Sequence, residues 1–199
     1  FVACGGSFAS SYPARYLLNQ EGTIRVQGYN ASEFVNATPR NIDKNTLVIG
    51  PSTKATAETV EAIRVANEKG AVTVGLSGYP DSLTAQTARY YITYYHADEW
   101  YQDPTLVHCN SQGTALKIAF WLLKEYCGYT HYEAALKAFE KMPEIYGKAY
   151  QQVKEDAAKF AMTYKDDKVW NVMSSGAAWE VSYSDAFCFF QEMQTVHCV

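Results

Sequence analysis

Residues 46–59 read Thr-Leu-Val-Ile-Gly-Pro-Ser-Thr-Lys-Ala-Thr-Ala-Glu-Thr and combine a strand, a loop and the start of a helix. The apolar run at 47–50 is typical of a short buried strand. Small hydroxyl residues follow it, and Val60, Ile63 and Ala66 then recur at helical spacing. A helix that starts directly after a strand presents unpaired N–H groups and the positive end of its dipole. The segment therefore predicts a binding site for phosphate or another small anion.

The candidate phosphate ligands come from this loop and from a similar segment at the start of the chain. Residues 1–7, Phe-Val-Ala-Cys-Gly-Gly-Ser, also pass from apolar residues into a loop of small residues. Hydroxyl groups donate hydrogen bonds to phosphate oxygens, and a lysine adds positive charge. Helix capping is the alternative role for the hydroxyls, and solvation is the alternative for the lysine. The candidate binding residues are Gly6, Ser7, Ser52, Thr53, Lys54 and Thr56.

Short apolar runs alternate with helical patterns along the first half of the chain. Strands are expected in the opening run and at residues 24–27, 47–50, 72–76 and 90–94. Connections of this length suit right-handed crossovers that carry a helix. The sequence therefore predicts an α/β fold in which helices cover both faces of an open parallel sheet. Ligands of such sheets bind at the carboxyl ends of the strands, where both small-residue loops are expected.

The composition favours a soluble protein that binds small molecules. The 199 residues are 48% apolar, carry a net charge of −4 and have a pI near 5.6. Nucleic acid is not an expected partner, because its phosphate backbone requires clustered lysine and arginine. No membrane association is expected either, since the longest apolar run, residues 119–123, is far shorter than the roughly 20 residues that span a bilayer.

Cysteine and histidine usage points to a reduced, metal-free protein of the cytoplasm. The five cysteines show no Cys-x-x-Cys spacing, and a chain of this size does not need disulfides to fold. The four histidines share no metal-ligand spacing with one another or with the cysteines. No metal site is therefore expected.

The second half of the chain is expected to leave the sheet domain and to begin another. A buried helix at 115–126 ends at Gly128, and a long amphipathic stretch follows, which Pro143 kinks or restarts. Residues 169–178 repeat the order of strand, small-residue loop and helix, and the aromatic side chains around them are expected to form a core. The expected division is 1–128 for the first domain, 129–167 for a helical connector and 168–199 for the truncated beginning of a second domain.

Five short motifs, in their order along the chain, resemble those of sugar isomerase (SIS) domains and, among them, of fructosamine 6-phosphate deglycases. They are Cys-Gly-Gly-Ser at 4–7, Tyr-Asn-Ala-Ser-Glu-Phe at 29–34, Pro-Asp-Ser at 80–82, Tyr-Lys-Asp-Asp-Lys at 164–168 and Glu-Met-Gln at 192–194. The resemblance implies a three-layer αβα SIS domain with a five-stranded parallel sheet, followed by the start of a second SIS domain. It also implies a sugar phosphate ligand, no cofactor, and a homodimer or higher homo-oligomer.

The resemblance assigns the phosphate to the loop that follows residues 47–50. The family writes this loop roughly as Ser-x-x-Gly-Asn-Thr-x-Glu-Thr. The matching residues 52–59 are one residue shorter and lack the Gly-Asn pair. The tight turn is therefore expected to close in a different way.

In the resembling deglycases a 6-phosphorylated Amadori product is hydrolysed to glucose 6-phosphate and an amine or amino acid. A base removes the C1 proton and an acid assists, which a carboxylate and an imidazole can do without a metal. The resemblance places this Glu and His beyond residue 199. Within the chain Glu33 is a weak catalytic candidate, because it matches a family Ser-Glu-Phe motif; an acid in the first turn of a helix is also expected from the dipole alone.

Two other functions remain open on the same fold. One is an aldose–ketose or amino-sugar phosphate isomerase, and the other is a non-catalytic phosphosugar sensor. An acidic loop at 97–103 is expected to overhang the cleft, where Asp98, Glu99 or Asp103 would face the ammonium group of an amino acid moiety. A solvated acidic loop is the alternative.

Overall fold

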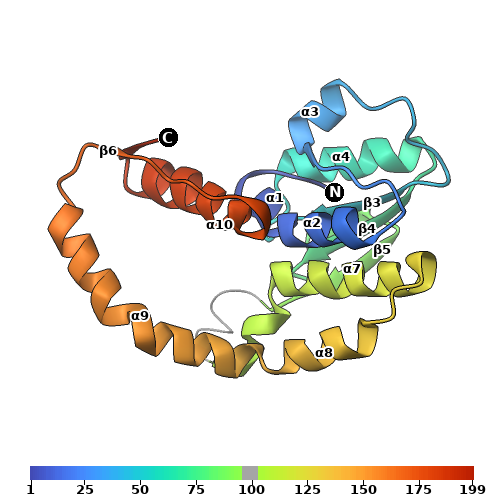
Figure 1. Cartoon of the computed structure of the whole chain (residues 1–199). Helices are drawn as coiled ribbons and strands as arrows, with labels where there is room; N and C mark the ends of the chain where they lie inside the picture. The colour runs from blue at the N-terminus through green and yellow to red at the C-terminus, as the bar shows by residue number, and fades with distance from the viewer. Residues whose placement is uncertain (96–102) are drawn as a thin grey trace.

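Parallel strands form the centre of the computed structural model, which describes residues 1–95 and 103–199 (Figure 1). Three of them pair in the order β3-β4-β5, and β1 pairs with β2. The strands of this region are β1 Val2–Ala3, β2 Tyr29–Asn30, β3 Leu47–Pro51, β4 Val72–Ser77 and β5 Tyr90–Thr93. β1 packs beside β3. The expected parallel α/β arrangement is confirmed, although the strands fall into two hydrogen-bonded groups instead of one continuous ladder.

The prediction of a strand at residues 24–27 is wrong in position, because the strand forms at Tyr29–Asn30. Ile24 and Val26 pack against the core in an extended segment, but the ladder with β1 forms only at β2. The carbonyl of Gln27 accepts a hydrogen bond from the Phe1 amine at 2.9 Å, and the Tyr29 amide donates to the Phe1 carbonyl at 2.9 Å. The alternation of apolar residues therefore predicted correctly that Ile24 and Val26 pack against the core. It did not predict which residues pair with β1.

Helices cover both faces of the strands. Successive strand residues point to opposite faces, and accordingly Val48 joins a core cluster with α3 and α4, while Ile49 joins one with α2 and α7. Figure 1 shows α4 on one side of the strands and α7 on the other. The helices of this part are α1 Gly5–Ser10, α2 Tyr12–Glu21, α3 Ala31–Asn36, α4 Ala57–Glu68, α5 Leu83–Thr87 and α7 Ser111–Cys127, with the 3-10 helix η1 at Pro104–Cys109.

Glycines end the two longer helices of this domain as expected. Gly70 follows α4 with φ +82°, and Gly128 caps α7 in the left-handed conformation with φ +67°. This conformation satisfies the last carbonyls of a helix at little steric cost when no Cβ is present.

A long helical arm leaves the sheet domain after α7. Its helices are α8 Tyr132–Glu140 and α9 Met142–Tyr164. Pro143 lies in the first turn of α9, where its missing N–H costs nothing, so it restarts the helix as expected. α9 has no buried residue and arcs away from the sheet domain (Figure 1).

The C-terminal segment returns from this arm to the N-terminal part of the chain. It contains β6 Val169–Trp170, η2 Gly176–Ala178, α10 Trp179–Tyr183, the π-helix η3 Ser184–Met193 and β7 His197–Cys198. β6 and β7 pair in parallel, and the second strand of this pair had no counterpart in the expectations. α10 and η3 pack on α1.

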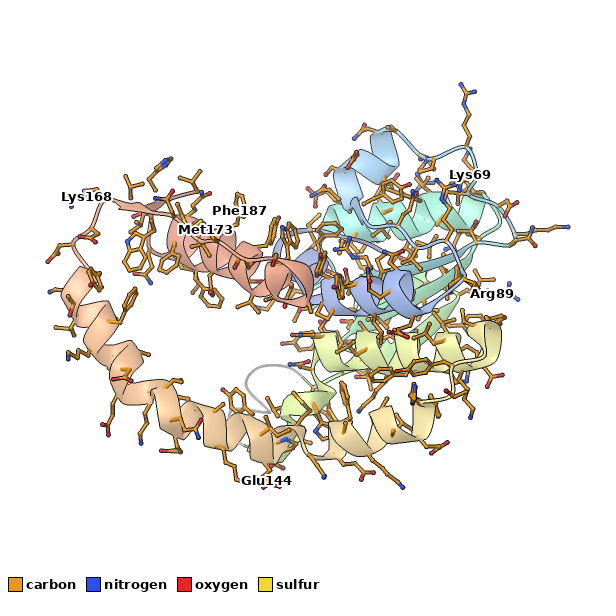
Figure 2. The ribbon with its side chains drawn as sticks, viewed as in Figure 1. Lys69, Arg89, Glu144, Lys168, Met173 and Phe187 are labelled. Atoms are coloured by element: carbon orange, nitrogen blue, oxygen red, sulfur yellow. The ribbon has the colours of Figure 1, made fainter. Side chains whose placement is uncertain are left out.

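The expectation that the aromatic residues of this segment form a core is partly wrong. Trp170 stacks on Phe190 with ring centroids 4.9 Å apart. Phe187 and Phe189, in contrast, are 51% and 53% exposed. Met173 is 89% exposed and is labelled with Phe187 on this segment in Figure 2. A single strand pair and one helix offer too little surface to bury all these rings.

Candidate functional site

The loops that follow β1 and β3 open into one cavity of about 460 Å³. This is the edge at which parallel sheets bind their ligands. Its lining is dominated by hydroxyl groups and glycines, with one carboxylate from the C-terminal π-helix. The lining residues are Cys4, Gly5, Gly6, Ser7, Ser10, Thr53, Thr56, Ser111 and Glu192.

The loop after β3 is held closed by Ser52. Its buried Oγ accepts a hydrogen bond from the Thr56 amide at 2.8 Å and donates to Thr56 Oγ1 at 3.3 Å. Ala55, between them, adopts φ +58°. A left-handed alanine is unusual, and it closes the turn at the place where the family carries its Gly-Asn pair. In this chain the shortened loop is closed by Ser52 and the left-handed Ala55.

Hydroxyl groups from four elements form a continuous chain along the cavity. Thr53 Oγ1 lies 2.8 Å from the Tyr94 hydroxyl, and Ser10 Oγ lies 3.0 Å from Ser111 Oγ. Tyr94 also interacts with Ser111, and this interaction links the two pairs. Burial raises the pKa of Tyr94, so its hydroxyl stays protonated as a donor. The chain fixes the direction in which Thr53 presents its oxygen.

Two long helices begin at this cavity. α4 starts immediately after Thr56, and α7 starts at Ser111, so a residue at the start of each helix lines the cavity. Asn110 caps α7 by accepting a hydrogen bond from the Gly113 amide at 2.8 Å. The positive ends of both helix dipoles are therefore directed at the same space, which suits an anion.

The structure brings together most of the predicted binding residues. Gly6, Ser7, Thr53 and Thr56 line the cavity, and Ser52 lies directly behind it as the support of the loop. Lys54 is exposed and is not among the lining residues.

The acidic candidates that the structure describes, Glu33 and Asp103, do not line the cavity. Glu33 is exposed in the first turn of α3 and does not line the cavity, which agrees with its alternative role at the helix dipole. Asp98 and Glu99 lie outside the described residues. Asp103 is exposed and also does not line the cavity.

Five lining residues were missed by the sequence predictions, and two of them, Cys4 and Gly5, directly precede the predicted Gly6. The Asn110-Ser111 pair directly before the apolar helix is an N-cap signal that could have identified Ser111. Ser10 follows Ser7 by one helical turn, and the same periodicity could have identified it. Glu192 lies 185 residues from Ser7 in the sequence, and only the return of the C-terminal segment reveals its place.

A larger hollow of about 1500 Å³ extends along the strands, from α7 to the segment before β3. Its lining includes the apolar side chains of Val74, Ile92, Ile118 and Trp121. The smaller cavity carries the denser set of convergent hydroxyl and amide groups, and it is the better candidate for binding a polar ligand.

Among the residues that the structure describes, no group of three or more His, Cys, Asp or Glu side chains could hold a metal ion. Among the same residues, no helix is both long and apolar enough to cross a membrane.

Comparison with known proteins gives a consistent picture. The family model for the SIS domain matches residues 1–121. Over 199 residues the chain is 34% identical to fructosamine deglycase FrlB of Bacillus subtilis (strain 168), covering 99% of this chain and 59% of that protein.

Two solved structures cover the whole chain. A putative phosphosugar isomerase from Bacillus subtilis shares 34% identity with a TM-score of 0.94, and one from Salmonella typhimurium LT2 shares 36% with a TM-score of 0.90. This chain covers 60% of each of those chains. It therefore spans about three fifths of the length of these relatives.

Proposed function

The chain belongs to the SIS domain family, and we propose that its hydroxyl-lined cavity binds a sugar phosphate as part of a fructosamine 6-phosphate deglycase. The observation that supports binding is the convergence of Ser7, Thr53 and Thr56 with the starts of α4 and α7. The cavity volume lies in the range of small-ligand sites. A phosphate placed there would accept hydrogen bonds from hydroxyls and from unpaired helix amides.

The choice of reaction rests on similarity to the deglycase FrlB along nearly the whole chain. The proposed substrate is a ketose 6-phosphate with an amine or amino acid nitrogen on C1, and the products are glucose 6-phosphate and the free amine. The described residues bind and orient this substrate by its phosphate. The proton transfers at C1 and C2 are assigned to the glutamate and histidine that the family resemblance places beyond residue 199.

The test is a direct assay with the intact gene product. Synthetic fructose-amino-acid 6-phosphates are supplied, and the release of glucose 6-phosphate is followed. Thr53→Val and Ser7→Ala are each expected to raise KM about tenfold, since each removes a hydrogen bond to a charged group. A Ser→Ala change on the exposed helix α3, Ser32→Ala, is the matched control and should change little. Absence of product with every amine tested would contradict the deglycase.

Isomerisation of a sugar phosphate is the second candidate, because the 34% and 36% identical structures are described as putative phosphosugar isomerases. Both reactions begin by moving a proton between C1 and C2 of a bound ketose phosphate. Interconversion of aldose and ketose phosphates without release of an amine would favour this candidate. Binding without any turnover would favour a sensor.

A further inference from the structure

The hydroxyl-lined cavity has no cation in its lining. Among the described residues that line it there is no Lys, Arg or His, and Glu192 is the only charged side chain. Lys54 is exposed and lies outside the lining. A phosphate dianion bound there would meet hydroxyls and helix amides, while the carboxylate would repel it. Binding of a dianion therefore calls for a positive charge close behind the wall of the cavity.

Arg15 on α2 carries a cation that no anion among the described residues neutralises. Its Nε and Nη2 atoms are buried, and neither has a hydrogen-bond partner in the part of the chain that the structure describes. The ion pairs of this part are those of Arg64 and Lys148, and Arg15 joins none of them. Burial lowers the pKa of Arg15, but a guanidinium stays protonated in proteins. A full positive charge is therefore held where water screens it little.

The Arg15 side chain runs back along its helix toward the loop that carries Ser7. The guanidinium carbon lies 4.4 Å from the ring centre of Phe8 and 5.4 Å from that of Tyr12. Side chains of a helix lean toward its N-terminus, which explains this direction. Phe8 directly follows Ser7, a lining residue of the cavity. The charge therefore lies close behind the wall of the cavity.

Backbone hydrogen bonds fix the place of this charge relative to the cavity. The Phe8 amide donates to the Cys4 carbonyl at 3.1 Å. The Ser11 amide donates to the Phe8 carbonyl at 3.2 Å, and the Arg15 amide donates to the Ser11 carbonyl at 3.1 Å. On its other side the guanidinium packs on Gly28, where a Cβ would clash with Arg15 Nη1. The cation is therefore held between the Phe8 ring and a glycine backbone.

We propose that Arg15 supplies the positive potential that stabilises a dianionic sugar phosphate in the cavity, and that this unpaired cation is retained at a cost in stability. This inference rests on the proposed function and deepens it. Burying an unpaired charge costs free energy, and an apolar side chain of similar length avoids that cost. The attraction to a ligand, in contrast, is proportional to the charge of the ligand. Removing the cation should therefore change stability and binding in opposite directions.

The first test compares two ligands of different charge. Glucose 6-phosphate, a dianion at pH 8, and glucose 6-sulfate, a monoanion, are titrated calorimetrically into the intact gene product and its Arg15→Met variant. The variant is expected to bind the phosphate ester about tenfold and the sulfate ester about threefold more weakly, because the interaction energy is proportional to charge. Arg15→Lys keeps the charge and should retain most of both affinities. Arg40→Met removes an exposed arginine outside the cavity lining and should leave both affinities unchanged.

The second test measures stability in the absence of ligand. Arg15→Met is expected to unfold at the same urea concentration as the wild type or at a higher one, since the desolvated charge is gone. A purely structural role for Arg15 predicts a lower midpoint and equal losses of affinity for the two esters. Either of these results, or unchanged affinities in Arg15→Met, would overturn the inference.

The outcomes also separate this inference from the proposed reaction. If the wild-type protein releases no glucose 6-phosphate from fructosamine 6-phosphates but binds it with the expected dependence on Arg15, the deglycase assignment fails and the role of Arg15 stands. If it releases glucose 6-phosphate while Arg15→Met binds both esters like the wild type, the role of Arg15 fails and the reaction stands.

Discussion

At the scale of single residues, the loop after β3 depends on a strained alanine. Ala55 has φ +58°, whereas a Cβ in this region clashes with the backbone. Ser52 compensates by bonding to the Thr56 amide across the turn. Strain of this kind persists where the surrounding structure holds it in place, and such positions cluster at ligand sites.

Ala55→Gly is expected to stabilise the protein. Glycine removes the steric cost of the left-handed conformation, about 1 kcal/mol, and part of this gain is lost to the greater freedom of the unfolded chain. Urea unfolding should show a higher midpoint with an unchanged slope. Ala57→Gly, two residues later in the first turn of α4, is the control and should lower the midpoint. A lower midpoint for Ala55→Gly would contradict the strain argument.

Tyr94→Phe tests the chain of hydroxyls. Tyr94 is 6% exposed and its hydroxyl lies 2.8 Å from Thr53 Oγ1, so the variant leaves a partly buried hydroxyl without this partner. The expected cost is about 1 kcal/mol of stability, together with weaker binding of a sugar phosphate. Tyr95→Phe changes an exposed neighbouring position outside the cavity lining, and it should change neither the stability nor the binding of a sugar phosphate. Unfolding curves and ligand titrations measure both effects, and equal behaviour of the two variants would refute this role.

At the scale of elements, glycine decides how closely a strand and a helix approach. A Cβ at Gly75, in the middle of β4, would lie 2.7 Å from the Thr84 carbonyl oxygen of α5. That oxygen belongs to the backbone and cannot rotate away. The packing of α5 on β4 therefore requires glycine at this position.

Gly75→Ala is accordingly expected to lower the free energy of unfolding by about 1–3 kcal/mol, the usual cost of overpacking. Gly147 in α9 offers the opposite case, since a Cβ there meets no atom within 4 Å. Gly147→Ala should be neutral or slightly stabilising, because alanine favours a helix. Thermal unfolding of the Gly75→Ala and Gly147→Ala variants compares their stabilities with that of the wild type. A Gly75→Ala protein as stable as the wild type would show that α5 can move away.

Elements with strong local signals were predictable, and elements set by distant partners were not. The strands β3, β4 and β5, the helix α4 and the restart at Pro143 follow from apolar periodicity and from backbone chemistry. The strand expected at residues 24–27 failed because hydrogen-bond register depends on the partner strand. In the cavity, the hydroxyls of the two loops carried a local signal for binding, whereas Glu192 was identified only as part of the Glu-Met-Gln motif and not as a cavity residue.

At the scale of the whole molecule, the cavity is completed by a segment that returns to α1 over the helical arm. This contact includes an acid that is costly to bury. Glu180, at the start of α10, is 8% exposed, and burial followed by the charge of Asp185 raises its pKa above the ordinary carboxyl value. The attachment of α10 and η3 is therefore sensitive to pH.

The sign of this sensitivity follows from proton binding. The folded state binds the proton of Glu180 more tightly than the unfolded state, so stability is greatest below the ordinary carboxyl pKa and falls as pH rises through the raised one. Hydrogen exchange of the α10 and η3 amides should accordingly be slower near pH 5 than near pH 8, after correction for intrinsic exchange.

Glu180→Gln should reduce this dependence and protect these amides at neutral pH, because a neutral amide loses no charge on burial. The remaining dependence is expected from Asp185, whose pKa burial also raises. Glu155→Gln on the exposed surface of α9 is the control and should retain the wild-type profile. An unchanged exchange profile in Glu180→Gln would show that the ionisation of Glu180 does not govern how this segment is held.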